Sequence, residues 1–252
     1  MIGRRSDRRP RDLLRAGLLL GFAALIGKLF VTGQITRYMA PALDPLTALA
    51  GIVMGAMGVA GLASGPRGEA SHAHAADPTE QALTIVLVIL PLGLGLFVTP
   101  RALGTGALGG ESVTRLLLAY APGPLPAGDA APPGPSQPIT DTAGVIAYLQ
   151  QAGLSGAGQR VRATGLAVFA ETLHAGEFAL LRYAIAHCVA DARPLVLLVT
   201  ASSERTATTD QWVEVEGVLS ITEREGARLV TIKADRTRPI PEPPNPYLGS
   251  SF

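Results

Sequence analysis

Three long apolar segments in the first hundred residues constrain this chain more than any other feature of its sequence. They cover residues 16–35, 46–63 and 82–99, and the second and third contain no charged residue. Each is long enough to cross a hydrocarbon layer of about 30 Å as a helix. The mean hydropathy of +0.31 and the charged fraction of 16% agree with a membrane protein. We therefore expect three transmembrane helices in contact with membrane lipid.

The residues before the first segment are rich in arginine, which indicates the direction of insertion. These arginines are Arg4, Arg5, Arg8, Arg9, Arg11 and Arg15. A cleaved signal peptide would have a shorter apolar region, whereas this one continues past Lys28. The positive-inside rule keeps the N-terminus in the cytoplasm. Three crossings then place everything after about residue 101 outside the cytoplasm, in a multi-pass protein of the cell membrane.

Small residues and a proline in the second and third segments indicate contacts between helices. Gly51 and Gly55 have a spacing that lets two helix backbones approach closely in lipid. Pro91 interrupts the third segment, and such a break survives in a bilayer only where protein or water satisfies the freed carbonyls. We expect these three residues to face a partner. A glycine-rich span without a specific partner and an ordinary proline kink are the alternatives.

The connection between the second and third segments contains His72 and His74. Two imidazoles at this spacing can bind zinc, copper or nickel. Two histidines alone make a weak site, and a solvated polar connector is the alternative.

The composition changes after the third apolar segment. Residues 111–120 have the pattern of a short amphipathic helix, which suits a membrane surface. Residues 121–138 are proline-rich, which is typical of a semi-rigid linker. We therefore divide the chain into a membrane domain, residues 1–120, this linker, and an extracytoplasmic β domain, residues 139–252.

The last domain has the pattern of a small all-β fold. Asp141 can cap a helix that Gly153 ends. Five segments with the character of strands follow it: 160–169, 178–188, 194–200, 212–222 and 228–234. A turn at residues 225–226 joins the last two strands. This order predicts a small closed five-stranded barrel of the OB type, with a half-open sandwich as the alternative.

Residues 178–200 are apolar enough to be mistaken for a further span. Arg182, Asp191 and Arg193 argue against a span. A charged residue at the centre of one costs roughly 2.5 to 3.5 kcal/mol, and a good apolar residue returns only about 0.3 to 0.6 kcal/mol. Two strands joined by a turn at residues 190–193 fit this stretch better.

Several motifs in the C-terminal part resemble those of one known family. In chain order they are Arg182-Tyr183, His187-Cys188, Ala190-Asp191-Ala192-Arg193-Pro194, Trp212-Val213-Glu214-Val215-Glu216-Gly217 and Asn245-Pro246-Tyr247-Leu248. Their order and spacing are similar to those of the YcgQ-like permease subunits, which accompany a YcgR-type permease. The resemblance extends over nearly the whole chain, and it implies an integral membrane protein that assists a multi-spanning permease. His187 stands where the family has the first cysteine of a pair, so two adjacent thiolates are not available.

His187, Cys188 and Asp191 are the main candidates for chemistry, because each can ligate a metal. On a regular strand residues 187 and 188 point to opposite faces, so they reach one ion only where the strand ends or bulges. Three ligands with an open position would suit a transient or transported zinc-like ion. The alternative is a small buried cysteine, a hydrogen-bonded histidine and a turn-forming aspartate. A catalytic thiol is a third reading, and the adjacent histidine is poorly placed as its base.

Trp212, the only tryptophan, opens the fourth predicted strand, where we expect it to be half exposed. It either plugs the end of the barrel or docks a partner. The net charge of +1 gives no electrostatic case for nucleic acid, and the expected location outside the cell argues against that partner as well.

Together these features favour an auxiliary, non-enzymatic subunit of a permease. We expect its helices to dock beside the permease and its external β domain to bind or gate a solute, a metal ion being one candidate. A membrane-tethered extracytoplasmic sensor or binding module without a transport role is the main alternative.

Overall fold

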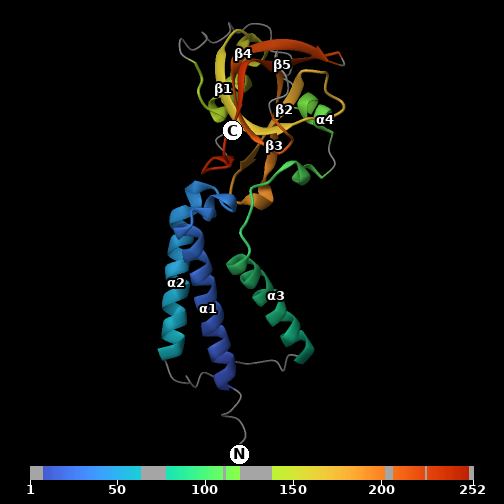
Figure 1. The fold of residues 1–252 in the computed structure, drawn as a ribbon. Helices are drawn as coiled ribbons and strands as arrows, with labels where there is room; N and C mark the ends of the chain where they lie inside the picture. Colours follow the sequence, from blue (N-terminus) through green and yellow to red (C-terminus); the bar gives the residue numbers. More distant parts are fainter. Residues whose placement is uncertain are drawn as a thin grey trace, which may run out of the picture. The chain divides into compact units, whose positions relative to one another are not determined.

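The computed structural model describes residues 8–63, 78–109, 112–119, 138–201, 207–224 and 226–249. The chain forms two compact units, Met1–Arg101 and Ala102–Phe252, here called the helical unit and the barrel unit (Figure 1). Residues 102–120, which we had grouped with the membrane domain, therefore belong to the barrel unit.

The helical unit contains three helices, α1 (Arg8–Val31), α2 (Asp44–Ala63) and α3 (Pro78–Phe97). Two short 3-10 turns, η1 (Gln34–Arg37) and η2 (Pro41–Leu43), connect α1 to α2. In the described part of the chain, two helical segments are long and apolar enough to cross a membrane, Leu13–Val31 and Pro41–Ala63.

The third predicted span does not reach this standard, which corrects the expectation for residues 82–99. The apolar helix described there is Val86–Phe97, about 18 Å long at 1.5 Å per residue. A hydrocarbon layer is about 30 Å thick. The helix itself starts earlier, at Pro78, but its first turn has the polar sequence Pro-Thr-Glu-Gln. Two candidate spans, not three, are therefore present among the described residues.

Glycines let α2 approach α1 closely. A Cβ at Gly51 would lie 2.9 Å from Cγ2 of Ile26, and one at Gly58 would lie 2.7 Å from Cγ of Leu20. Both contacts are shorter than real Cβ atoms tolerate, so larger residues would push the helices apart. The backbone approach expected from the glycine spacing thus occurs within this chain.

The barrel unit is built on one sheet that closes on itself. Its strands are β1 (Arg160–Val168), β2 (Glu177–Ile185), β3 (Arg193–Ala201), β4 (Trp212–Arg224), β5 (Ala227–Pro239) and β6 (Tyr247–Gly249). Their order is β1-β4-β5-β3-β2-β6, and an additional β1–β2 pairing closes a five-stranded ring. All pairings in the ring are antiparallel except β3–β5. The ring fits an OB-like barrel, and its closure argues against a half-open sandwich.

Side chains fill the interior of the barrel. Its core includes Phe178, Leu180, Val199, Val215, Leu219 and Ile232, each at most 4% exposed. Helix α5 (Thr142–Ala152) adds the fully buried Val145. As predicted, Asp141 caps this helix, its Oδ1 accepting a hydrogen bond from the Gly144 amide at 2.7 Å.

Two further elements cover the outside of the sheet. Helix α4 (Val113–Ala119) buries Val113, Leu116 and Leu117 and packs against β3 and β5. This corrects the expectation that residues 111–120 lie on a membrane surface, because the apolar face of the helix is used by the barrel. Strand β6 pairs in parallel with β2. Helix α4 thus lies on β3 and β5, and β6 extends the sheet beside β2.

Candidate functional site

Three side chains of the barrel hold the segment that follows α3. This segment, residues 103–105, is called the strap. The Leu103 amide donates to the hydroxyl of Tyr247 at 3.1 Å, and the hydroxyl of Tyr183 donates to the Gly104 carbonyl at 3.0 Å. Asp210 accepts from the amide of Thr105 at 2.7 Å and from its hydroxyl at 2.8 Å. We call Tyr183, Asp210 and Tyr247 the strap clamp.

A side chain at position 104 would crowd the clamp. A Cβ there would lie 2.9 Å from Oδ1 of Asp210. Asp210 itself has a φ of 65°, and among the described residues it is the non-glycine residue with positive φ. Aspartate and asparagine tolerate this conformation better than most side chains. The backbone conformation at Asp210 therefore serves to aim its carboxylate at the strap.

The electrostatics of the clamp favour a neutral tyrosine. Desolvation, followed by the nearby charges of Asp210 and Tyr247, raises the pKa of Tyr183 to about 12. Its hydroxyl therefore keeps its proton at neutral pH and can act as the hydrogen-bond donor to Gly104.

A buried arginine next to Tyr183 of the clamp contacts several neighbouring segments. Arg182 is 6% exposed. Its Nη1 donates to Oγ1 of Thr164 at 3.0 Å, and its Nη2 donates to the carbonyl of Asn245 at 3.2 Å. Its guanidinium carbon lies 5.0 Å from the centre of the Trp212 ring, a cation–π arrangement. Burial lowers the pKa of Arg182 to about 10.

Arg182 thus ties together β1, β4 and the C-terminal segment that carries Tyr247 of the clamp. Asn245 lies two residues before Tyr247, and Tyr247 pairs with Tyr183 across β2 and β6. No ion pair to Arg182 is found among the described residues, so neutral groups and an aromatic face hold its charge. Burying a cation costs desolvation free energy. In return, the Arg182 side chain joins three parts of the barrel unit.

The structure places His187 and Cys188 beyond the end of their predicted strand, next to Asp191 in the predicted turn. β2 ends at Ile185, earlier than the predicted 188, and the turn η5 (Val189–Asp191) follows. Oδ2 of Asp191 accepts a hydrogen bond from the His187 amide at 2.9 Å and lies 3.0 Å from Nδ1 of its ring. Oδ1 accepts from the Ala186 amide at 2.9 Å. The sulfur of Cys188 accepts from the Asp191 amide in a capping box.

These contacts describe a local turn. Desolvation raises the pKa of Asp191, but hydrogen bonds from the amides of residues 186, 187 and 188 and from the His187 ring outweigh it and lower the pKa below its usual value. In the described ranges no group of three His, Cys, Asp or Glu residues could hold a metal ion. His72 and His74 lie outside the described residues.

The other predicted site residues have structural surroundings. Trp212 is buried, 9% exposed, and not half exposed as we expected. Gly51 of α2 packs against α1. A Cβ at Gly55, also in α2, would lie 3.6 Å from Cβ of Ala23 in α1. Pro91 lies on an exposed part of α3. The described contacts of both glycines are therefore within the chain.

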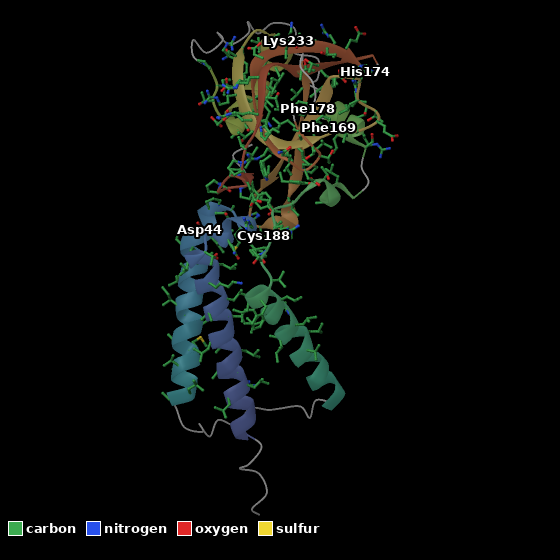
Figure 2. All side chains as sticks on the ribbon, viewed as in Figure 1. Asp44, Phe169, His174, Phe178, Cys188 and Lys233 are labelled. Carbon is green, nitrogen blue, oxygen red and sulfur yellow. The ribbon has the colours of Figure 1, made fainter. Side chains whose placement is uncertain are left out.

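A second polar cluster joins the β1–β2 loop to the end of β4. The buried side chains of Arg224 and Glu177 form an ion pair. Arg224 also donates to the carbonyl of Thr172 at 3.2 Å, and Glu177 accepts from the His174 amide at 2.9 Å. The rings of Phe169 and Phe178 lie 5.5 Å apart in the same part of the barrel (Figure 2).

Sequence reasoning missed the strap clamp as a site. Tyr183 and Tyr247 belong to two motifs that we had quoted for a family resemblance, which was the available signal. Nothing singled out Asp210 or the strap, because their contact joins residues 105 positions apart.

Comparison with known proteins gives two family matches. Residues 14–113 match the DUF1980 N-terminal domain, and residues 145–248 match the DUF1980 C-terminal domain. No curated protein matches the chain.

Proposed function

We propose that this chain, which carries both DUF1980 domains and whose C-terminal motifs resemble those of the YcgQ-like permease subunits, is an auxiliary, non-enzymatic subunit of a membrane permease. The helical unit would lie in the bilayer beside a YcgR-type partner, and the barrel unit would lie outside the cytoplasm. The single observation that carries the proposal is the strap clamp, which fastens the barrel to the segment directly after α3.

The surface of the helical unit supports a place in lipid. Among the described residues, every exposed large hydrophobic side chain except Ile221 belongs to this unit. On α2 these are Leu46, Leu49, Ile52, Val53, Met57, Val59 and Leu62. Such a surface is unfavourable in water, at roughly 25 cal/mol for each Å² of apolar area. Large exposed apolar patches mark membrane or protein contacts.

The strap clamp supports a coupling role for the barrel. Residues 98–102 form a short covalent tether between the end of α3 and the strap. The clamp binds main-chain atoms of Leu103, Gly104 and Thr105, so a displacement of the strap acts on β2, on β6 and on the turn before β4 that contains Asp210. A barrel fastened in this way would follow movements of the helices in a permease complex.

The packing of the barrel favours gating over internal binding of a solute. Its core side chains are close to fully buried, and a closed ring of five strands leaves no room for a ligand. The turn at residues 187–191 gives no support for a metal ion. We therefore assign the barrel to coupling or gating of the partner.

Co-expression with a candidate permease tests the proposal. The full chain should co-purify with the permease in mild detergent. The matched variant Asp210→Asn, which keeps a residue suited to positive φ, should still co-purify but should expose the Leu103 and Thr105 amides to faster hydrogen exchange. A chain that is inserted in the membrane but never recovered with the permease would contradict the subunit role and favour a tethered sensor.

A reporter fused after Phe252 tests the proposed orientation. The proposed orientation needs α3, whose apolar stretch Val86–Phe97 is short, to complete a third crossing beside the two candidate spans. With the arginine-rich start in the cytoplasm, three crossings predict activity on the non-cytoplasmic side. Activity confined to the cytosol would instead mean that the chain crosses the bilayer an even number of times.

A further inference from the structure

Lys28 is the charged residue within the apolar part of α1, between Ala16 and Val31. Its ammonium donates hydrogen bonds to the carbonyl oxygens of Gly95 at 3.1 Å and Leu96 at 2.7 Å. Both acceptors belong to the last turn of α3, so a side chain of one helix caps the end of another.

The end of a helix needs such donors. The last four carbonyls of an α-helix have no partner within the helix, and together they carry a partial negative charge of about half an electron. In lipid no water is available, and each unsatisfied carbonyl costs several kcal/mol. A cation at this position satisfies two carbonyls and also complements the helix dipole.

Further contacts between α1 and α3 lie along the same helix interface. A Cβ at Gly21 would lie 2.7 Å from Cδ2 of Leu92, and one at Gly95 would lie 3.0 Å from the methyl groups of Leu25. The contacting residues advance in the same order along both helices, so α1 and α3 run parallel. Lys28 joins their C-terminal ends. Figure 1 shows the blue α1 and the green α3 coming closer toward those ends.

We propose that Lys28 is a positioning residue that locks the C-terminal half of α3 beside α1 and keeps the two helices parallel. The inference rests on the proposed place of the helical unit in lipid, where water cannot replace the ammonium group. The lock compensates for the weak points of α3, which are its short apolar length and Pro91 directly before the contact.

Cysteine cross-linking in membranes tests this role. The chain has one cysteine, Cys188, so Cys188→Ser gives a clean background. The α1–α3 pair is Gly21→Cys with Leu92→Cys. The control α1–α2 pair is Ala23→Cys with Gly55→Cys, whose 3.6 Å spacing is close to the roughly 3.8 Å of a disulfide.

In this background Lys28→Met should reduce oxidative α1–α3 cross-linking at least about tenfold, the effect of losing about 1.4 kcal/mol. The α1–α2 cross-link should persist, and Lys28→Arg should keep both because its guanidinium can donate to the same carbonyls.

Unchanged α1–α3 cross-linking in Lys28→Met would overturn the proposal. Loss of the control α1–α2 cross-link together with the α1–α3 cross-link, in both Lys28→Met and the milder Lys28→Gln, would also overturn the proposal. It would show that Lys28 affects the whole helical unit and not the position of α3 alone. A parent chain that stays soluble after lysis would instead contradict the membrane location itself, which separates the two failures.

Discussion

The two units of this protein treat their large apolar side chains in opposite ways. The barrel unit buries them, and Ile221 is the exception among its described residues. The helical unit exposes them along α2 and α3 and places Gly51 and Gly58 at its buried helix contact. A surface of each kind suits a different solvent, water for the barrel and lipid for the helices. The comparison shows that mean hydropathy describes this chain poorly, because it averages two surfaces.

The units also differ in how they use buried polar groups. The barrel buries Arg182 and Arg224 and gives the Nη atoms of each guanidinium hydrogen-bond partners. In the described apolar part of α1, Lys28 is the corresponding group, and it binds main-chain carbonyls. Each unit is compact by itself, so a substitution in one should not unfold the other. Trp212 provides a signal that comes from the barrel alone.

The largest effect is expected from breaking the buried ion pair of the barrel. Arg224→Met leaves the carboxylate of Glu177, whose side chain is 8% exposed, without its cation. Breaking a buried pair in this way costs about 3 to 5 kcal/mol. Chemical denaturation of the full chain in detergent, followed by Trp212 fluorescence, should show the lowered midpoint.

The double variant Glu177→Gln with Arg224→Met is the control, because it removes both charges. It should recover part of the lost free energy of unfolding. Equal stability of Arg224→Met and the parent chain would show that the pair does not support the barrel.

A smaller effect is expected in the other unit. Gly58→Leu places a side chain where a Cβ would already lie 2.7 Å from Leu20, and overpacking of this kind costs about 1 to 3 kcal/mol. Thermal unfolding followed by circular dichroism of the helices should occur at lower temperature, while the Trp212 signal should not move.

Gly27→Leu is the matched control in α1, because a Cβ there meets nothing within 4 Å. It should leave the helical transition near that of the parent chain. A similar loss in both variants would mean that close packing at Gly58 is unimportant.

The smallest effect concerns the exposed turn at Asp191. Its pKa lies below the ordinary value of about 3.9, because hydrogen bonds outweigh desolvation. The folded state thus binds this proton less readily than the unfolded chain. The resulting stability is present above pH about 3.9 and is lost as pH falls through the lower folded value. In Asp191→Asn, the denaturation midpoint followed by Trp212 fluorescence should depend less on pH in this range. An unchanged pH dependence would contradict the lowered pKa of Asp191.

Local patterns predicted much of this fold. Hydropathy located α1 and α2, the cap at Asp141 located α5, and alternation located the five strands of the ring to within a few residues at most ends. These features depend on neighbours in sequence, which is why one sequence suffices to find them. β5 was the exception, because its last five residues, 235–239, are polar or proline and lack alternation.

The parts that could not be predicted depend on contacts between distant residues. The amphipathic pattern of α4 is the same for a helix on a membrane and a helix on a barrel, and only the sheet decides between them. β6 is three residues long and gains its partner from β2. The strap clamp forms only when Leu103, Tyr183 and Tyr247 come together in the fold. No spacing in the sequence predicts this contact. For His187, Cys188 and Asp191, β2 ends early enough to bring them into one turn, but the Asp191 carboxylate accepts hydrogen bonds from the amides of residues 186–188. The sequence spacing does not show that use of the carboxylate.

The attachment of α4 and the strap to the barrel has a consequence for the integrity of the chain. Both lie before residue 120, and the ring of strands begins after residue 159, so the covalent path between them runs through the proline-rich stretch. The barrel nevertheless holds the earlier segment directly, through Tyr183, Asp210 and Tyr247 and through the buried face of α4. A protease that cuts once between residues 121 and 137 would thus yield two fragments that stay associated, and such a nicked protein would still migrate as one species until denatured.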